Sequence, residues 1–379
     1  MYQSSFSERD MTRFGTNILS NFFDLYLIDC SGFVKKNENV FEAQFLSQSS
    51  NNLIFKNYKT IKKFLDKINL TFYIDLLGSD IQSFKTRRLL KNKSVLRIKL
   101  SLGMLPWVKD NIGIITRLNN LRKAGNFIDK LFNQIFTRLL SKFEPSIDIQ
   151  ISSGSACQKS TSPHVNNIWT HSFDYQEFIE KKSCSDSNYK DIGEYALFID
   201  QYAPSHPDYS FHGNNPPVSE DKYYKSLNKF FDYFEEKVGF NIVIAGHPKR
   251  NEKSNYCWNN RKQIIGNTSQ LISQSSIVLT HYSTAISFAV LNRKPILLIT
   301  TDEYINSYRR QQFYGFSEAL NLDILNVDQY NEFEVTHEIF RVNEKVYSDY
   351  EEKYIRSKLS KSNDIWKHVS EYLINIKSS

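Results

Sequence analysis

Long apolar runs are missing from this sequence: no stretch approaches the roughly 20 consecutive apolar residues that a membrane-spanning helix needs. Residues 1–15 also lack the basic segment and the apolar core of a secretory signal peptide. The cysteines are scattered, with no Cys-x-x-Cys pair and no histidine at ligand spacing, which argues against a zinc site or a disulfide framework. We therefore expect a cytoplasmic protein.

Internal repeats and low-complexity blocks are absent as well, and the composition is that of a globular protein. The 379 residues are too many for one compact core, which predicts two domains. The net charge is +7 at pH 7. A mildly basic surface suits phosphorylated substrates, an anionic membrane face or nucleic acid, although solvated surface lysines explain most of the excess.

The first half of the chain alternates short apolar runs with amphipathic segments. Alternating strands and helices predict a parallel sheet that is covered on both faces. Polar residues at 175–189 then predict a linker. Strands are expected at 22–30, 52–57, 70–80, 94–107, 146–154 and 166–174, and helices at 59–68 and 126–143.

The second half repeats this order and predicts a second doubly wound unit. Ser219 can cap the helix that follows the first strand, and Gly239 stands just beyond its end. We expect domains at 1–180 and 190–345, with C-terminal helices at 346–379 that pack back across the domains. Strands are expected at 195–201, 241–248, 276–283 and 294–300, and helices at 222–239, 268–275 and 283–293.

Polar side chains follow these strands at their carboxyl ends, where open α/β sheets bind their ligands. Asp200 ends the strand at 195–201, and His206 and Asp208 follow in the next loop. A carboxylate at this position is a candidate base, nucleophile or hydroxyl anchor, while turn capping is the simpler explanation.

A second such position follows the apolar strand at 241–248. The strand runs through Gly246 into His247, Pro248 and Lys249. The imidazole and the ammonium group can bind phosphate or sugar oxygens, and the proline fixes the turn. Exposed cations after an ordinary strand are the alternative.

The third position lies after the strand at 276–283. His281 stands near its end, and Ser283 and Thr284 open the following helix. Hydroxyl groups and backbone N–H groups at a helix N-terminus bind phosphate oxygens, although a plain serine cap is common. The neighbouring His-Pro-Lys stretch favours the phosphate interpretation.

The series from residue 195 to 305 resembles the C-terminal half of bacterial surface-polysaccharide glycosyltransferases of GT-B type. The His-Pro-Lys stretch and the Ser283-Thr284 pair are similar to motifs of bacterial sialyltransferases, polysialyltransferases and Kdo transferases, where they bind the CMP part of the donor. The resemblance implies a GT-B-like α/β fold of two Rossmann-like, doubly wound domains facing a cleft, with the acceptor on the N-terminal side and the nucleotide-sugar donor on the C-terminal side. Periplasmic binding proteins and some epimerases share this layout.

Two departures from the resembled families matter. Ser287 and Phe288 stand where many UDP-sugar GT-B enzymes carry a glutamate that holds the ribose, which favours a CMP donor. The Asp-Gly or Glu-Asp-Gly base motif of the resembled sialyltransferases is missing. Asp29 and Asp75, which both end apolar strands, remain as candidates for a base in the N-terminal domain.

The resemblance thus implies a glycosyltransferase of capsule, O-antigen or lipooligosaccharide synthesis. It would transfer a CMP-linked ulosonic acid, such as sialic acid or Kdo, to a glycan or a lipid-linked glycan, by an inverting or a retaining route. The predicted catalytic residues are Asp200, His206, Asp208 and Asp75. The predicted donor-binding residues are His247, Pro248, Lys249, His281, Ser283 and Thr284.

We expect neither a cofactor nor a metal, because no Asp-x-Asp motif stands out and His247, Lys249 and the helix start at Ser283 can neutralise a departing nucleotide. The basic stretch at 85–93 and the helix at 126–143 are candidate contacts with anionic lipid at the cytoplasmic face of the inner membrane.

Other functions remain open on the sequence. A UDP- or GDP-sugar transferase and a sugar-nucleotide epimerase would share the phosphate site. A sugar-nucleotide binding module would not need so many titratable groups at strand ends. A nucleic-acid binder is disfavoured, because no RNA- or DNA-binding motif accompanies the basic stretch.

Overall fold

The computed structural model divides the chain into two compact units. The first comprises Met1–Leu102, Ile128–Phe173 and Arg356–Ser379, and the second comprises Gly103–Phe127 and Asp174–Ile355. The structure describes residues 1–3, 6–34, 51–55, 57–91, 93–108, 139–140, 143–160, 164–182, 189, 192–211, 214–250 and 258–378.

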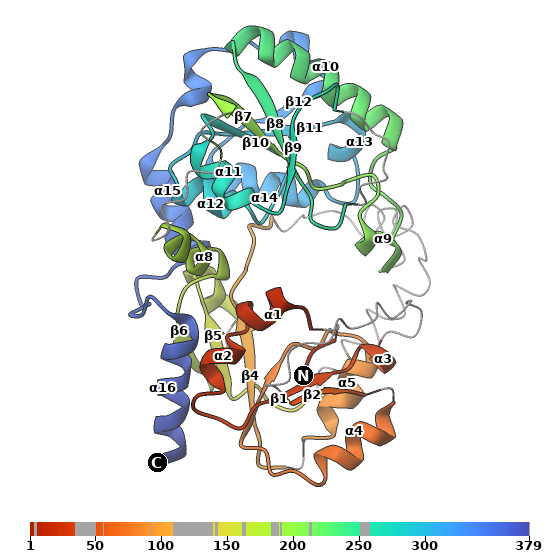
Figure 1. The fold of residues 1–379 in the computed structure, drawn as a ribbon, viewed down its shortest axis with the longest axis vertical. Helices are drawn as coiled ribbons and strands as arrows, with labels where there is room; N and C mark the ends of the chain where they lie inside the picture. The colour runs from red at the N-terminus through yellow and green to blue at the C-terminus, as the bar shows by residue number, and fades with distance from the viewer. Residues whose placement is uncertain are drawn as a thin grey trace. The chain divides into compact units, whose positions relative to one another are not determined.

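The second unit is built on a parallel sheet whose strand order is β12-β11-β10-β7-β8-β9 (Figure 1). This is the doubly wound order in which the chain first adds strands on one side of β7 and then returns to the other. β9 and β12 were not predicted, because edge strands of three residues carry almost no periodic pattern. The strands are β7 (Tyr195–Ile199), β8 (Asn241–Gly246), β9 (Gln263–Ile265), β10 (Ile277–Thr280), β11 (Ile296–Thr300) and β12 (Ile324–Asn326).

Side chains of β7 alternate between two hydrophobic cores, as the pleat of a strand requires. Tyr195 and Leu197 pack into the core on the side of α11 and α12, and Phe198 packs into the core on the side of α10. Figure 1 shows α10 on one side of this sheet and α11, α12 and α14 on the other. The helices are α8 (Phe173–Lys182), α9 (Pro207–Phe211), α10 (Glu220–Val238), α11 (Thr268–Gln274), α12 (Ile286–Leu291), α13 (Asp302–Ile305), α14 (Arg310–Leu320) and α15 (Glu344–Tyr350), with the 3₁₀ helices η3 (Val327–Glu332) and η4 (His337–Phe340) and the π-helix η5 (Glu351–Ile355).

The long helix α10 confirms its predicted position, and its ends follow from local chemistry. Phe230, Phe231 and Phe234 are fully buried against the sheet. Gly239 ends the helix in the left-handed region at φ 80°, as its position predicted. Ser219 occupies the N-cap position, but its hydroxyl donates to Glu303 at 2.8 Å instead of capping the helix.

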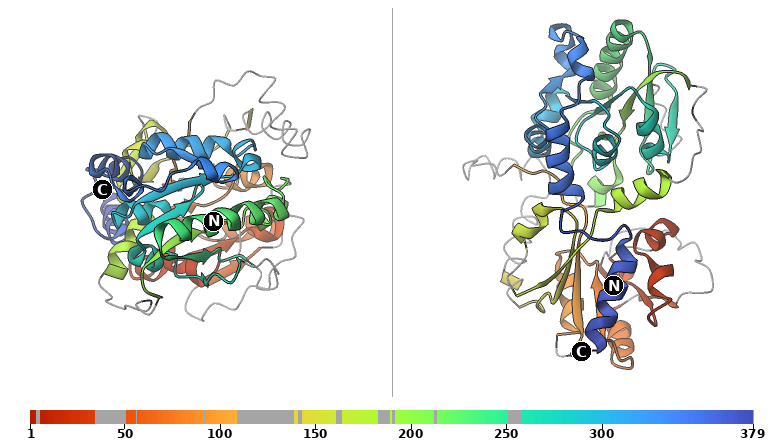
Figure 2. Two further views of the ribbon diagram at one scale, coloured as in Figure 1. Left: turned by 90° about the horizontal axis from the view of Figure 1, so that it is seen from above. Right: turned by 90° about the vertical axis from the view of Figure 1, so that its left-hand side faces the viewer.

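The first unit contains a parallel four-stranded sheet of order β3-β4-β5-β6 and a parallel pair, β1-β2. Trp366 and Val369 of the C-terminal helix α16 pack with Ile98 and Ile151 in its core, beside the strands in Figure 2. The elements are α1 (Glu8–Arg13), α2 (Thr16–Leu19), β1 (Tyr26–Asp29), α3 (Ser31–Val34), β2 (Asn51–Ile54), α4 (Tyr58–Leu65), β3 (Phe72–Asp75), α5 (Ile81–Arg88), β4 (Leu96–Ser101), β5 (Ile149–Ser152), η1 (Ser155–Ser160), β6 (Asn166–Trp169) and α16 (Ile365–Ser378).

The polar stretch expected as a linker is helical as far as Lys182, because α8 begins at Phe173. The amphipathic helix predicted at 126–143, with its proposed lipid contact, lies outside the described residues apart from 139–140 and 143. None of the helices in the described part of the chain is long and apolar enough to cross a membrane.

Gly315 provides a test of packing in the second unit. A Cβ atom at this position of α14 would lie 2.6 Å from the backbone oxygen of Pro106 and 2.9 Å from the backbone nitrogen of Trp107. We expect Gly315→Ala to lower the free energy of unfolding by roughly 1–3 kcal/mol, because backbone atoms cannot move aside cheaply. The control is Gly103→Ala, where an added Cβ meets nothing within 4 Å. Urea unfolding that shows Gly315→Ala to be as stable as the unaltered protein would contradict this packing.

Candidate functional site

The candidate site lies at the point where the strand order of the second unit reverses. β7 and β10 are neighbours in the sheet, yet the chain visits β8 and β9 between them. In open α/β sheets this reversal leaves a crevice beyond the carboxyl ends of the strands, and ligands bind there. Asp200 follows β7, His247 follows β8, and His281 follows β10. The candidate residues predicted from the sequence therefore lie at the expected carboxyl edge of the sheet.

Asp200 is part of a buried ion pair. Its carboxylate oxygen Oδ2 accepts a hydrogen bond from Nη1 of Arg250, and Oδ1 accepts one from the backbone N–H of Tyr202 at 2.8 Å. The side chain of Asp200 is 0% exposed and that of Arg250 is 3% exposed. Burial raises the pKa of the Asp200 carboxyl, and the charge of Arg250 opposes that rise. Both charges are enclosed and compensate each other.

An aromatic enclosure surrounds this pair. The guanidinium carbon of Arg250 lies 5.3–5.5 Å from the ring centroids of Tyr202, Tyr224 and Trp258. Such contacts are attractive because the ring faces are electron-rich. Tyr202 takes the left-handed backbone conformation, with φ 53°, in the turn that directs its N–H at Asp200. The pair thereby ties the loop after β7 to the loop after β8.

The imidazoles of His206 and His247 contact each other in the loops that follow β7 and β8. Their Nε2 atoms are 3.3 Å apart and their ring centroids 4.6 Å apart. The Nδ1 atom of His206 accepts the backbone N–H of Asp208 at 3.1 Å, and Nδ1 of His247 accepts that of Lys249 at 3.1 Å. A neutral imidazole whose Nδ1 accepts carries its proton on Nε2. Two Nε2–H donors therefore converge on one place.

Charged groups flank the two imidazoles. Nζ of Lys249 binds Oδ1 of Asp208 at 2.9 Å, and both side chains are about half exposed. Burial lowers the pKa of His206; the Asp208 carboxylate raises it, while Lys249 and Arg309 lower it further. This cluster thus places imidazole N–H groups next to an accessible ammonium group. It can bind an anion or an oxygen-rich ligand.

His281 is placed differently from the expectation that it contacts a donor. The ring is fully buried; Nδ1 donates to the carbonyl of Ile299 at 2.7 Å and Nε2 accepts the hydroxyl of Tyr223 at 2.8 Å. Burial lowers the pKa of His281 to about 4, partly offset by the bond to Ile299. Both ring nitrogens are therefore hydrogen-bonded within the core of the second unit.

Ser283 and Thr284 precede the short helix α12, as expected. The hydroxyl oxygen of Ser283 accepts the backbone N–H of Ala285 at 3.2 Å, which leaves its own proton available for a ligand. Thr284 is exposed. Ser287 and Phe288, at the position of the missing glutamate, are buried.

Asp75 lies in the first unit and forms its own ion-pair cluster. Its Oδ2 accepts Nε of Arg87 at 2.7 Å and Nε of Arg97 at 2.8 Å, and both cations also reach Glu144. Burial disfavours the charge, but the two guanidinium groups outweigh it and the pKa of Asp75 lies below its usual value. This carboxylate is a poor proton acceptor. Arg87 of the basic stretch at 85–93 is thus a core residue, whereas Lys85 and Arg88 are exposed.

Arg309 was not among the predicted site residues. Its guanidinium carbon lies 5.8 Å from the ring centroid of Tyr209 and 5.1 Å from that of Tyr308, and its charge contributes to the low pKa of His206. It stands directly before α14, a helix that was not predicted from the sequence. The adjacent pair Arg309-Arg310 was the sequence feature that could have drawn attention to it.

Within the described residues, no three histidine, cysteine, aspartate or glutamate side chains stand in an arrangement that could hold a metal ion.

Comparison with known proteins assigns the fold. No family model matches the sequence, and a comparison with curated proteins finds no similar sequence. Among solved structures the chain has the GT-B glycosyltransferase fold. The wall teichoic acid polymerase TagF aligns with 99% of this chain and 87% of its own, at TM-score 0.57 and 11% identity.

Two further TagF structures agree. The H444N variant aligns with 100% of this chain and 88% of its own, at TM-score 0.55 and 12% identity. The same variant soaked with CDPG aligns with 100% and 86%, at TM-score 0.53 and 12% identity. Likeness at this level of identity shows the fold alone.

The buried ion pair can be tested by a double-mutant cycle. We expect Arg250→Met to cost about 3–5 kcal/mol of unfolding free energy, because it leaves the Asp200 carboxylate buried without its partner. The double variant Asp200→Asn/Arg250→Met should be more stable than Arg250→Met alone, since no charge stays buried. Strictly additive losses in urea unfolding would show that the two side chains do not interact.

His281 makes stability depend on pH. The unfolded chain protonates it near its ordinary pKa of about 6.5, whereas the folded protein keeps it neutral down to about 4. Its contribution is therefore fully present above pH 6.5 and is lost as the pH falls toward 4, by on the order of 3 kcal/mol. His281→Gln should lose less stability across this window. Parallel profiles of unfolding free energy against pH for the two proteins would refute the assignment.

Proposed function

We propose that the protein is a glycosyltransferase of bacterial surface-polysaccharide synthesis that binds the phosphate of a nucleotide-sugar donor between His206 and His247. The convergence of two Nε2–H groups is the observation that supports this most directly. Two such donors 3.3 Å apart cannot both donate to each other, but one ligand oxygen can accept from both. A phosphate oxygen meets that need and is drawn by the neighbouring ammonium group of Lys249.

The same groups supply what the reaction needs. Transfer of the sugar breaks the bond between its anomeric carbon and the phosphate oxygen, and negative charge develops on the departing nucleotide. In this proposal the two imidazoles and Lys249 stabilise that charge, with the Ser283 hydroxyl as a further donor. Arg309 adds positive charge close to His206. We place two more residues on the donor side. Thr284 is exposed beside Ser283, and Pro248 fixes the turn after His247.

Asp200 takes a different role here from the one its position suggested. Its carboxylate is bound to Arg250 and enclosed, which is unfavourable for a base or nucleophile that must touch substrate. We assign it as a positioning residue that holds the His247 turn through Arg250. Asp208 orients Lys249. Asp75, with its lowered pKa, is assigned to the structure of the first unit.

The identity of the donor remains part of the proposal. The His-Pro-Lys and Ser-Thr pattern supports a CMP-linked ulosonic acid, and the absence of a glutamate near Ser287 is consistent with it. TagF, which shares the fold, was soaked with CDPG, so a CDP-linked donor is the second candidate. Transfer without a metal, to a glycan or lipid-linked acceptor at the cytoplasmic face of the membrane, completes the proposal.

The proposed phosphate site predicts nucleotide-dependent stabilisation. A ligand that binds only the folded state raises the melting temperature, by an amount equivalent to about 2.7 kcal/mol at 100 times its Kd. We expect CMP or CDP to shift the Tm, UDP and GDP to shift it less, and EDTA to leave the shift unchanged. His247→Ala should abolish the shift.

The matched control is His337→Ala, which removes an exposed histidine of η4 in the same unit. It should retain the full shift. A larger shift with UDP or GDP would keep the transferase and replace the donor. No shift with any nucleotide, or a full shift in His247→Ala, would overturn the proposed phosphate site.

A further inference from the structure

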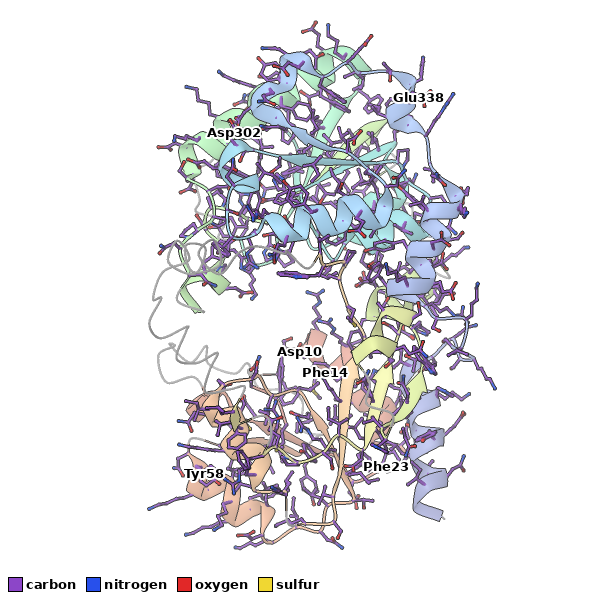
Figure 3. All side chains as sticks on the ribbon, turned by 180° about the vertical axis from the view of Figure 1, so that it is seen from behind. Asp10, Phe14, Phe23, Tyr58, Asp302 and Glu338 are labelled. Carbon is purple, nitrogen blue, oxygen red and sulfur yellow. The ribbon has the colours of Figure 1, made fainter. Side chains whose placement is uncertain are left out.

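Arg309 stands between two helices beyond the carboxyl end of β11. This strand leads into α13, which begins at Asp302, labelled in Figure 3, and α14 begins at Arg310. Ser307 fixes the turn between the helices. Its hydroxyl donates to the carbonyl of Tyr304 at 2.7 Å, and its oxygen accepts the backbone N–H of Arg309 at 3.1 Å. Arg309 is therefore held at the edge where open α/β sheets bind their ligands.

Two aromatic rings flank the guanidinium group of Arg309. Its carbon atom Cζ lies 5.8 Å from the ring centroid of Tyr209 and 5.1 Å from that of Tyr308. The hydroxyl of Tyr308 donates to the carbonyl of Asn215 at 3.0 Å, which holds that ring in place. The faces of aromatic rings attract cations, so these contacts restrict where the half-buried guanidinium can point.

The charge of Arg309 is not neutralised as the neighbouring cations are. Lys249 pairs with Asp208, and Arg250 pairs with Asp200. Arg309 forms no ion pair with a carboxylate in the part of the chain that the structure describes, and its buried Nε atom meets no hydrogen-bond acceptor there. Removing a charge from water costs free energy unless the charge is paired. An anionic ligand group at this guanidinium would therefore be stabilised.

The side chain of Tyr209 connects Arg309 to the proposed phosphate site. The ring of Tyr209 contacts the imidazole of His206, with the two centroids 5.9 Å apart, and the guanidinium lies against the same ring. Arg309 is also close to Tyr282, which directly precedes Ser283: burial raises the pKa of the Tyr282 hydroxyl, and the charge of Arg309 opposes that rise. Arg309 thus lies near both loops that border the crevice, those after β7 and β10.

We infer that Arg309 is a specificity-determining residue that binds a second anionic group of the donor, next to the phosphate held by His206 and His247. That group is the second phosphate of a nucleoside diphosphate or the carboxylate of a CMP-linked ulosonic acid. Both present a pair of oxygens, which the parallel N–H groups of a guanidinium can bind together. A donor with one anionic group would leave Arg309 without an acidic partner.

The inference rests on the proposed function and deepens it. The two histidines and Lys249 bind the phosphate that every candidate donor shares. Arg309 then distinguishes the donors by the number of their anionic groups, a property that the His-Pro-Lys and Ser-Thr pattern does not address.

Binding of matched nucleotides tests this role. The probes are CMP, which has one anionic group, and CDP and CMP-N-acetylneuraminic acid, which have two, each titrated into the full chain by calorimetry. We expect CDP or CMP-N-acetylneuraminic acid to bind at least about tenfold more tightly than CMP, and the probe that gains affinity identifies the second group. Arg309→Gln should reduce this preference to about threefold or less. Arg309→Lys should give an intermediate preference, because the charge stays while the paired N–H groups are lost.

The matched control is Arg341→Gln, which removes an exposed arginine of the same unit that pairs with Glu338. It should keep the full preference. Equal affinities of the unaltered protein for the three nucleotides, an unchanged preference in Arg309→Gln, or a loss of affinity in Arg309→Gln that is the same for all three probes would overturn the inference. The last result would show that Arg309 only supports the fold of the site.

Inorganic pyrophosphate separates this inference from the function on which it rests, because it carries two phosphates and no nucleoside. Pyrophosphate binding that is lost in Arg309→Gln, without binding of any nucleotide, would keep the paired anion site and remove the transferase. Nucleotide binding with a preference that does not depend on Arg309 would do the reverse. No binding of pyrophosphate or of any nucleotide would overturn both.

Discussion

The arrangement of the candidate site depends on the ion pair between Asp200 and Arg250. It joins the loops that leave β7 and β8, two strands that are neighbours in the sheet but far apart in the chain. Charges buried this deeply are tolerated only when they are well paired and hydrogen-bonded. The surrounding aromatic rings and the backbone N–H of Tyr202 meet that condition. The Asp200–Arg250 pair thereby fixes the turn that carries His247. The edge of the His247 imidazole then faces the proposed ligand position.

Three histidines of the second unit have different environments and different roles. His281 is neutral because it is enclosed, and it uses both nitrogens to bind the core. His206 and His247 are half-buried, and their Nε2 atoms lie 3.3 Å apart. The two cases differ in the backbone group that contacts Nδ1. At His281 it is a carbonyl, and at His206 and His247 it is an N–H group.

Sequence patterns predicted buried strands such as β7, because a strand covered on both faces reads as a continuous apolar run. They also predicted α10, whose buried stripe repeats with the period of a helix, but they missed α14. The short strands β9 and β12 left no such period. The edge of the sheet that bears the site was also predictable, since each candidate directly follows an apolar run. Side-chain roles were not: that Arg250 would neutralise Asp200, or that Tyr223 would hold His281, depends on contacts across 50 and 58 residues. No local pattern encodes such pairings.

The C-terminal helix has a consequence for how the protein is made. Trp366 and Val369 of α16 fill the core of the first unit, which otherwise consists of residues from the beginning of the chain. On the ribosome, that core stays incomplete until the helix has been synthesised, whereas the second unit has all its strands earlier. Synthesis of the first unit therefore begins before that of the second unit, but its core is completed later. During translation its apolar surface is exposed for longest, which makes it the part of the nascent chain most dependent on protection from aggregation.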